Sequence, residues 1–317
     1  MRSLLFATAA VSFALPLAAQ NRLNPVIELL EQKKPIFGLY AAANPRARPG
    51  DPPPTEPARQ PKELAALSLT QPTADYLFDG SMERNFDRSY PVFNEFAYGI
   101  FEAGVLSGKR LKQPLFVKTP EIAPDPALAR ERISHQLNLG VSGIVFVDLQ
   151  SAAELEQGIA MMRFRSDGGT RPDNVADAPK LWGMTDKQYR EKADVWPLDP
   201  RGELVNFGIV ESIEGLAHVR EIAAVKGLGV LFPGAGTLRG VFSTTDSAGR
   251  RVLDQAKWEA AIQQVLAACK EFKVPCGYPA GEADIEMRMQ QGFSVFVIGW
   301  GAPGFRAVEI GRRVGKR

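Results

Sequence analysis

Eight short apolar runs, separated by stretches with helical periodicity, are the feature that most constrains the fold of this 317-residue chain. Most of the runs are continuously apolar rather than alternating, which is typical of parallel strands covered on both faces. They lie at 35–43, 75–80, 114–119, 143–149, 204–212, 229–234, 274–280 and 293–299. The pattern predicts a (β/α)8 TIM barrel, whose active site would lie at the carboxyl ends of the strands. A doubly wound sheet is the alternative.

Two segments interrupt this rhythm. Residues 165–203 separate the fourth and fifth predicted strands and are too long for an ordinary connection. They include a predicted helix, TDKQYREKADVW, and form either a packed surface excursion or a lid or subunit contact. Residues 44–62 are proline-rich and polar, and they predict a long irregular loop rather than a linker. Residues 20–317 are therefore expected to form one barrel domain.

The N-terminus has the layout of a secretory signal peptide. One early Arg precedes an apolar stretch from Leu4 to about Leu15, and small residues precede Gln20. Cleavage after Ala19 would remove residues 1–19 and leave a periplasmic or secreted protein. The apolar stretch is shorter than the ~20 residues that a membrane span needs, so no membrane association is expected after cleavage.

Charge and cysteine content narrow the class of protein further. Lys and Arg number 38 against 36 Asp and Glu, and long basic runs are absent, which argues against a nucleic-acid partner. The two cysteines, Cys269 and Cys276, match no zinc motif. A disulfide between them could form in an oxidising compartment, but two buried free thiols are the favoured interpretation.

Polar residues at the predicted strand ends are the candidates for chemistry. Glu211 ends the fifth run, and a loop containing Gly234, Ala235, Gly236 and Thr237 follows the sixth. A carboxylate suits a hard divalent cation, and glycines let backbone N–H groups approach an anionic substrate. The alternatives are a structural ion pair between Glu211 and Lys118 or an Arg, and a simple glycine turn.

Other charged residues near the strand ends could complete such a site. Asp79 and Glu83 lie at and just beyond the second run, and Lys118 ends the third. We expect Asp79 or Glu83 to act as a helper metal ligand or a base, and Lys118 to balance the charge of the substrate. His135 and His218 fall within helical patterns, and we expect both to lie away from the site.

Three segments resemble the HpcH/HpaI aldolase/citrate lyase family in order and spacing, over roughly residues 110–300. They are GVSGIVFVDLQSAAELEQGIAMMRF, VESIEGLAHVREIAAVKGLGVLFPGAG and GEADIEMRMQQGFSVFVIG. The stretch WGMTDKQYREKADVW also resembles an insertion that the family carries after strand four. The resemblance implies a metal-dependent (β/α)8 enzyme that makes or breaks C–C bonds next to 2-oxo acids or thioesters. It also implies a homo-oligomer.

The family's site residues carry over only in part. Glu211 matches the first metal carboxylate, and residues 234–236 match the loop that holds the substrate carboxylate. The second metal carboxylate falls on Thr237, and a substrate-binding Arg falls on Lys118, which loses the bidentate fork. A catalytic His of the aldolase branch is missing from DGSMERN, which retains Asp79 and Glu83.

We therefore expect a C–C lyase, dependent on Mg²⁺ or Mn²⁺, that acts on a 2-oxo acid or a related hydroxy acid. The first alternative is a catalytically degenerate periplasmic barrel that binds a small organic acid. The second is an enzyme for a larger aromatic acid, with Trp182 or Trp196 lining the pocket.

Overall fold

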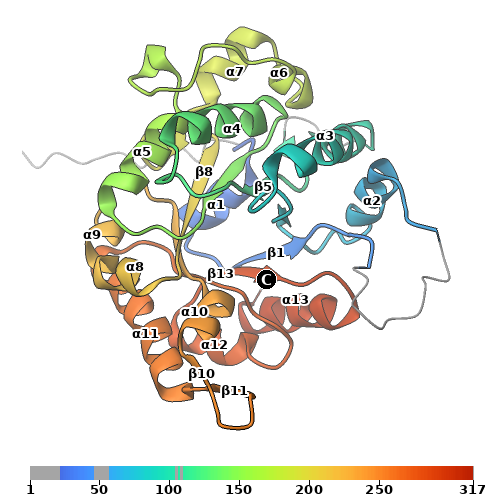
Figure 1. The fold of residues 1–317 in the computed structure, drawn as a ribbon. Coiled ribbons are helices and arrows are strands. Elements are labelled where there is room, and N and C mark those ends of the chain that lie inside the picture. The colour runs from blue at the N-terminus through green and yellow to red at the C-terminus, as the bar shows by residue number, and fades with distance from the viewer. Residues whose placement is uncertain (1–21, 46–56, 104–105, 108–109, 317) are drawn as a thin grey trace, which may run out of the picture.

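Eight parallel strands close into a ring in the computed structural model, which describes residues 22–45, 57–103, 106–107 and 110–316 (Figure 1). In ring order they are β1 (Ile36–Tyr40), β2 (Tyr76–Asp79), β5 (Leu115–Lys118), β6 (Gly143–Phe146), β8 (Leu204–Val210), β9 (Val230–Pro233), β12 (Gly277–Tyr278) and β13 (Val295–Ile298). An isolated parallel bridge between Leu231 and Cys276 joins β9 to β12 and closes the ring.

The (β/α)8 TIM barrel predicted from the sequence is thus confirmed, and the doubly wound alternative is wrong. Each of the eight strands lies within its predicted run. The path of paired strands runs from β12 through β13 and β1, as in the register Ile36↔Val295, and on to β8 and β9. An open doubly wound sheet would leave its two end strands apart, whereas the Leu231–Cys276 bridge joins β9 to β12.

Helices surround the ring. Those that follow its strands are α2 (Pro61–Ser68), α3 (Phe86–Glu102), α4 (Pro126–Asn138), α5 (Ala152–Met162), α8 (Ile213–Ala217), α9 (Val219–Ala223), α10 (Ala235–Val241), α11 (Gln255–Phe272), α12 (Ile285–Gln291) and α13 (Ala302–Val314). Side chains of Asp125, Ser151, Ser212 and Asp254 each accept a hydrogen bond from a first-turn N–H, which fixes where α4, α5, α8 and α11 begin.

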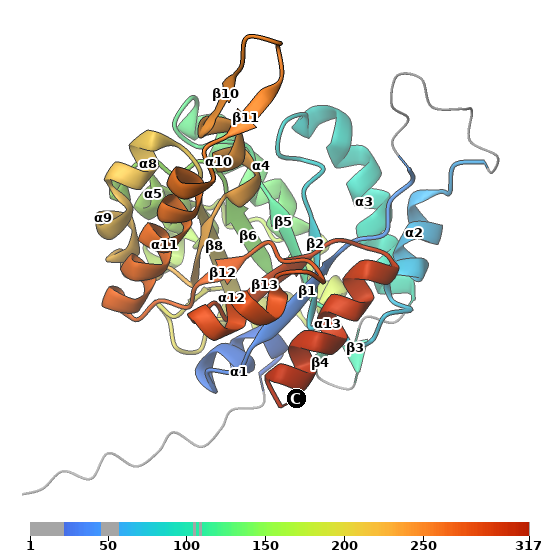
Figure 2. The same ribbon diagram turned by 90° about the horizontal axis from the view of Figure 1, so that it is seen from below.

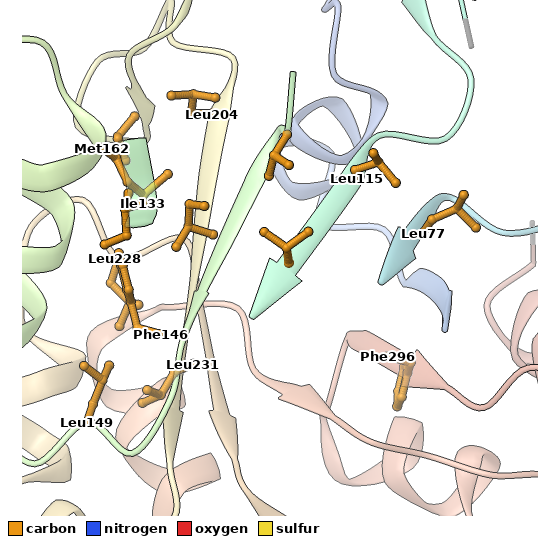
Figure 3. Packing of buried hydrophobic residues seen from close by; sticks show 14 of the residues in the cluster. Leu77, Leu115, Ile133, Phe146, Leu149, Met162, Leu204, Leu228, Leu231 and Phe296 are labelled. Atoms are coloured by element: carbon orange, nitrogen blue, oxygen red, sulfur yellow. The ribbon is translucent and has the colours of Figure 1, made fainter. Parts of the chain in front are cut away.

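Two hydrophobic cores hold this arrangement together. One lies between strands and helices and includes Leu77, Phe146 and Phe296 (Figure 3). The other fills the barrel interior, where α1 (Pro25–Glu31) closes the amino-terminal ends of the strands with the fully buried Val26 and Ile27. The helix α1 therefore covers the barrel interior at that end.

Residues 165–203 pack along the amino-terminal side of the barrel. They form η1 (Arg165–Asp167), α6 (Ala178–Leu181), α7 (Asp186–Lys192) and β7 (Val195–Trp196). The predicted helix TDKQYREKADVW is confirmed over α7, whereas its last two residues form β7. Trp182 is buried and donates a 2.8 Å hydrogen bond to Gly140 O, ahead of β6. Trp196, in β7, pairs with Val205 near the start of β8, and its side chain packs against the core of the barrel interior. The segment is a packed excursion and not a lid over the strand ends.

The cysteine prediction was wrong. Cys269, near the end of α11, and Cys276, just before β12, form a disulfide with a Cα–Cα distance of 5.6 Å. This separation lies within the usual range of about 4.4–6.8 Å. The turn after α11 reverses the chain, so the two cysteines meet although both read as ordinary apolar positions in the sequence.

The remaining elements lie at the edges. β3 (Leu106–Ser107) pairs with β4 (Arg110–Leu111), and β10 (Ser243–Thr245) pairs with β11 (Arg251–Leu253) as a hairpin that projects beside α10 (Figure 2). The expected leader, 1–19, lies outside the described residues, as does most of the proline-rich loop.

The described ends of the proline-rich loop contact each other: the Asn44 side chain exchanges two 2.9 Å hydrogen bonds with the Arg59 backbone just before α2. No described helix is long and apolar enough to cross a membrane.

Candidate active site

A cavity of about 190 Å³ opens at the carboxyl ends of the strands. Strand-end residues from most of the barrel form its wall, together with the first turn of α10. The lining residues are Tyr40, Phe78, Lys118, Val145, Phe207, Ile209, Glu211, Phe232, Pro233, Gly234, Ala235, Gly236, Thr237, Pro279 and Val297. Among the residues predicted for the site, Lys118, Glu211 and 234–237 therefore meet around one cavity, whereas Asp79 and Glu83 do not line it.

Glu211 follows β8 directly and is 7% exposed. Its burial raises the pKa of the carboxyl group, while a hydrogen bond from the Thr237 hydroxyl and the charge of Lys118 act in the opposite direction. The charges of Glu83 and Asp148 raise the pKa further. Glu211 is thus a buried acid with other carboxylates near it, an environment that favours a proton or a bound cation.

The glycine at 234 lets the loop approach Glu211. The register Val210↔Pro233 between β8 and β9 places residue 234 beside residue 211. A Cβ at position 234 would lie 2.3 Å from Glu211 Cβ and 2.5 Å from Glu211 Oε2, which is too close for any real contact. At Gly236 an added Cβ would meet nothing within 4 Å. Only the first of the two glycines is therefore required by packing.

The loop differs in one respect from the expected anion cradle. The Gly234 N–H donates a 2.8 Å hydrogen bond to Val210 O, so this group is not available to a substrate. Residues 235–237 form the first turn of α10, where N–H groups have no partner within the helix. A substrate carboxylate could therefore use the N–H groups of 235–237, while Gly234 contributes by having no side chain.

Lys118 and Glu83 form the ion pair of the site. Lys118 Nζ lies 2.9 Å from Glu83 Oε2, and their side chains are 15% and 25% exposed. The alternative pairing of Lys118 with Glu211 is therefore wrong. Glu83 reaches the cavity only through Lys118, which it holds at the rim.

Asp79 lies at the end of β2 but supports the following turn. Its Oδ1 accepts hydrogen bonds from the Ser81 N–H, at 2.9 Å, and from the Ser81 hydroxyl, at 2.6 Å. Burial raises the pKa of the Asp79 carboxyl group, and the two bonds from Ser81 oppose that shift. Its role as helper ligand or base stays a prediction.

The two histidines lie outside the cavity lining, as expected. His135 is exposed on α4 and contacts the Tyr90 ring. His218 lies between α8 and α9, with its Nδ1 3.0 Å from Gln150 O. The described residues that line the cavity include no imidazole that could serve as a general base.

Asp148 is a strand-end carboxylate that does not line the cavity. It follows β6, has a positive φ of 45°, and its buried Oδ1 has no hydrogen-bond partner among the described residues. A strained backbone and an unsatisfied acceptor beside Glu211 are features of functional sites. The one available signal was its position at the end of the fourth apolar run.

The described residues offer few candidate ligands for a divalent metal. They contain no group of three or more His, Cys, Asp or Glu side chains that could share an ion. Mg²⁺, however, is commonly held by one or two carboxylates and completes its shell with water and substrate oxygens. The carboxylates that could serve such an ion are Glu211, in the cavity lining, and Asp148, whose buried Oδ1 has no partner among the described residues. Thr237 donates its hydroxyl to Glu211.

Comparison with known proteins bears on the fold. An HpcH/HpaI aldolase/citrate lyase family protein from Burkholderia cenocepacia J2315 superposes with a TM-score of 0.64 at 19% sequence identity, over 92% of this chain and 98% of that chain. The chain has the fold of the HpcH/HpaI aldolase/citrate lyase family. An HpcH/HpaI aldolase from Desulfitobacterium hafniense DCB-2 superposes with a TM-score of 0.58 at 15% sequence identity, over 87% of this chain and 90% of that chain. No family model and no curated protein matches the sequence.

A third solved structure with this fold carries ligands. Protein CitE from Mycobacterium tuberculosis, in complex with magnesium and acetate, gives a TM-score of 0.50 at 12% identity, over 90% of this chain and 92% of that one. The HpcH/HpaI resemblance inferred from sequence motifs is thus confirmed at the level of the fold.

Proposed function

We propose that this chain is a carbon–carbon lyase of the aldolase type, dependent on a divalent metal, that acts on a 2-oxo acid or a related hydroxy acid. The observation that carries the proposal is the meeting of buried Glu211, the Lys118 cation and the first turn of α10 around one strand-end cavity. The fold shared with HpcH/HpaI proteins supports it, and so does the magnesium and acetate bound by the Mycobacterium tuberculosis protein.

Glu211 would hold the metal ion, Mg²⁺ or Mn²⁺, with Asp148 as the candidate second carboxylate. The bound ion would polarise the substrate carbonyl and stabilise the negative charge that develops when the C–C bond breaks. Burial favours this role, because a desolvated carboxylate gains more from a cation than an exposed one does. The Thr237 hydroxyl orients the Glu211 carboxyl group.

The remaining residues would orient the acid and move a proton. The N–H groups of residues 235–237 would hold the substrate carboxylate, and Lys118 would balance its charge. A carboxylate would accept the hydroxyl proton as the bond breaks and return it to the enolate carbon. Glu83 lies outside the cavity lining and is paired with Lys118 at 2.9 Å, so it would take this role only after exchanging Lys118 for the substrate. Asp79, engaged by Ser81, is the less favoured base.

A retro-aldol assay tests the proposal. The purified protein would be incubated with a panel of 4-hydroxy-2-oxo acids, with Mg²⁺, with Mn²⁺ or with a chelator, and the 2-oxo acid released would be measured. We expect release that requires metal and is lost in Glu211→Gln. Tight binding of the acids without turnover under any of these conditions would contradict the lyase and favour the non-catalytic binding barrel.

A further inference from the structure

The cavity has two chemically different parts. Its polar groups, Lys118, Glu211 and residues 235–237, lie at the rim formed by strand ends and α10. Beneath them the lining belongs to the core of the barrel interior. Six apolar side chains form this floor: Phe78, Val145, Phe207, Ile209, Phe232 and Val297.

The floor is built to stay apolar. Val297 and Ile209 are 6% and 7% exposed, and the Phe207 side chain is fully buried. The rings of Phe207 and Phe232 pack 5.2 Å apart and fix the shape of the base. A polar group placed here would lose its hydrogen bonds to water and gain none in return, which is costly.

The cavity is also larger than a polar head group needs. A site must offer at least about 10–15 Å³ of such volume to hold one water molecule, so 190 Å³ accepts on the order of ten water-sized groups. Pyruvate, with its carboxylate and keto group at the rim, would leave the floor in contact with trapped water. A substrate with an apolar extension would displace that water.

We propose that the substrate is an acid with an apolar tail of several carbons, whose polar head binds at the rim while the tail enters the barrel floor. This inference rests on the proposed function, because it uses the same cavity and the same rim groups. Among 2-oxo and hydroxy acids, the cavity should bind those with branched aliphatic tails most tightly and those that are short or doubly charged most weakly.

Calorimetry with three acids in the presence of Mg²⁺ tests the proposal. The probes are pyruvate, 4-methyl-2-oxopentanoate and 2-oxoglutarate, the last of which has a charged tail of similar length. Each buried methylene strengthens binding by about fourfold, so the branched acid should bind up to on the order of fiftyfold more tightly than pyruvate. The charged acid should bind more weakly than pyruvate.

A polar isostere in the floor provides the matched variant. Val297→Thr keeps the volume and adds a hydroxyl, so it should weaken the branched acid several-fold more than it weakens pyruvate. The same substitution at Val252, which is 50% exposed on the β10–β11 hairpin, should change neither affinity.

The outcomes separate this inference from the proposed function. Pyruvate binding that needs Glu211, with no gain for the branched acid and no selective effect of Val297→Thr, would overturn the apolar-tail proposal alone. Failure of all three acids to bind, in wild type and in Glu211→Gln alike, would overturn the proposed function as well.

Discussion

The carboxyl group of Glu211 is buried at the end of β8, and this burial raises its pKa above the ordinary value of 4.5. A group whose pKa is raised in the folded state contributes stability below its unfolded-state pKa and loses it as the pH rises through the folded-state pKa. In metal-free buffer Glu211 therefore contributes less to stability at neutral pH than at acidic pH.

Glu211→Gln removes this charge while keeping the shape of the side chain. We expect its Tm to exceed that of wild type at pH 7 and the difference to disappear below about pH 4, where the wild-type carboxyl is protonated in both states. Thermal unfolding across pH, with a chelator present, measures this. Glu282→Gln, which removes an exposed partner of Arg306, should give no such gain; an equal gain there would contradict the explanation.

Alanine substitutions at the two loop glycines, Gly234 and Gly236, should have different effects on stability and metal binding. Gly234→Ala would force Glu211 to move, because the new Cβ would lie 2.5 Å from Oε2. We expect a loss of about 1–3 kcal/mol in unfolding free energy and much weaker metal binding. Gly236→Ala meets open space in the first turn of α10 and should leave stability equal or slightly higher. Denaturant unfolding and metal titration of both variants measure these effects. Equal effects of the two substitutions would contradict the close approach of residue 234 to Glu211.

At the scale of single residues, part of the site could be predicted from the sequence. Glu211 and the loop at 234–237 could be found because each directly follows an apolar run. The ion pair of Lys118 with Glu83 could not, because it joins residues on neighbouring strand ends that are 35 positions apart. The apolar floor was also missed, because a continuous apolar run does not reveal which of its residues face the barrel interior.

At the scale of elements, the seam between β9 and β12 is the least regular part of the ring. β12 has two residues, and one isolated bridge, Leu231↔Cys276, joins it to β9. The disulfide from Cys269 to Cys276 ties this same point to the end of α11. A covalent link therefore reinforces the position where backbone pairing is sparse.

Reduction of this disulfide should destabilise the protein. For cysteines separated by 7 positions, the chain-entropy account predicts a loss of about 2 kcal/mol. Denaturant unfolding with and without a reductant measures the loss, and a variant with Cys269→Ser and Cys276→Ser serves as the control that reductant should not affect. Two titratable thiols in the untreated, unfolded protein would contradict the disulfide.

The strands of the barrel were easier to predict than the placement of the insertion. Continuous apolar runs indicate buried parallel strands whatever their order. The insertion at 165–203 contains a helix visible in the sequence, but the side of the barrel on which it packs depends on contacts such as that of Trp182 with Gly140. Such tertiary contacts leave no periodic pattern, so lid and excursion were indistinguishable beforehand.

At the scale of the whole molecule, the first described residue is part of the fold. Arg22 is 4% exposed and donates a 3.3 Å hydrogen bond to Gly202 O, and the side chain of Glu203 accepts a hydrogen bond from the Asn24 N–H. Cleavage after Ala19 would leave these contacts intact. A homo-oligomer, suggested by the family resemblance, stays a prediction, and the mass of the protein in solution would test it.

We propose that the protein is exported and begins at Gln20 after processing. Expression of the full chain in a bacterial host, followed by fractionation and intact-mass measurement, should recover a product lacking residues 1–19 from the periplasm or the medium. An export-blocked control, with Leu4 and Leu5 replaced by Asp, should retain the full-length mass in the cells. A full-length wild-type product in the cytosol would contradict export.

The most direct test of the active site follows hydrogen–deuterium exchange at C3 of pyruvate and of 4-methyl-2-oxopentanoate by NMR in D₂O. With Mg²⁺ or Mn²⁺ present, wild type should catalyse exchange, because the rim of the cavity would stabilise an enolate. A chelator or Glu211→Gln should reduce the rate by on the order of a hundredfold or more. Exchange that persists at the wild-type rate in Glu211→Gln, or no exchange of either acid with metal present, would contradict the assignment.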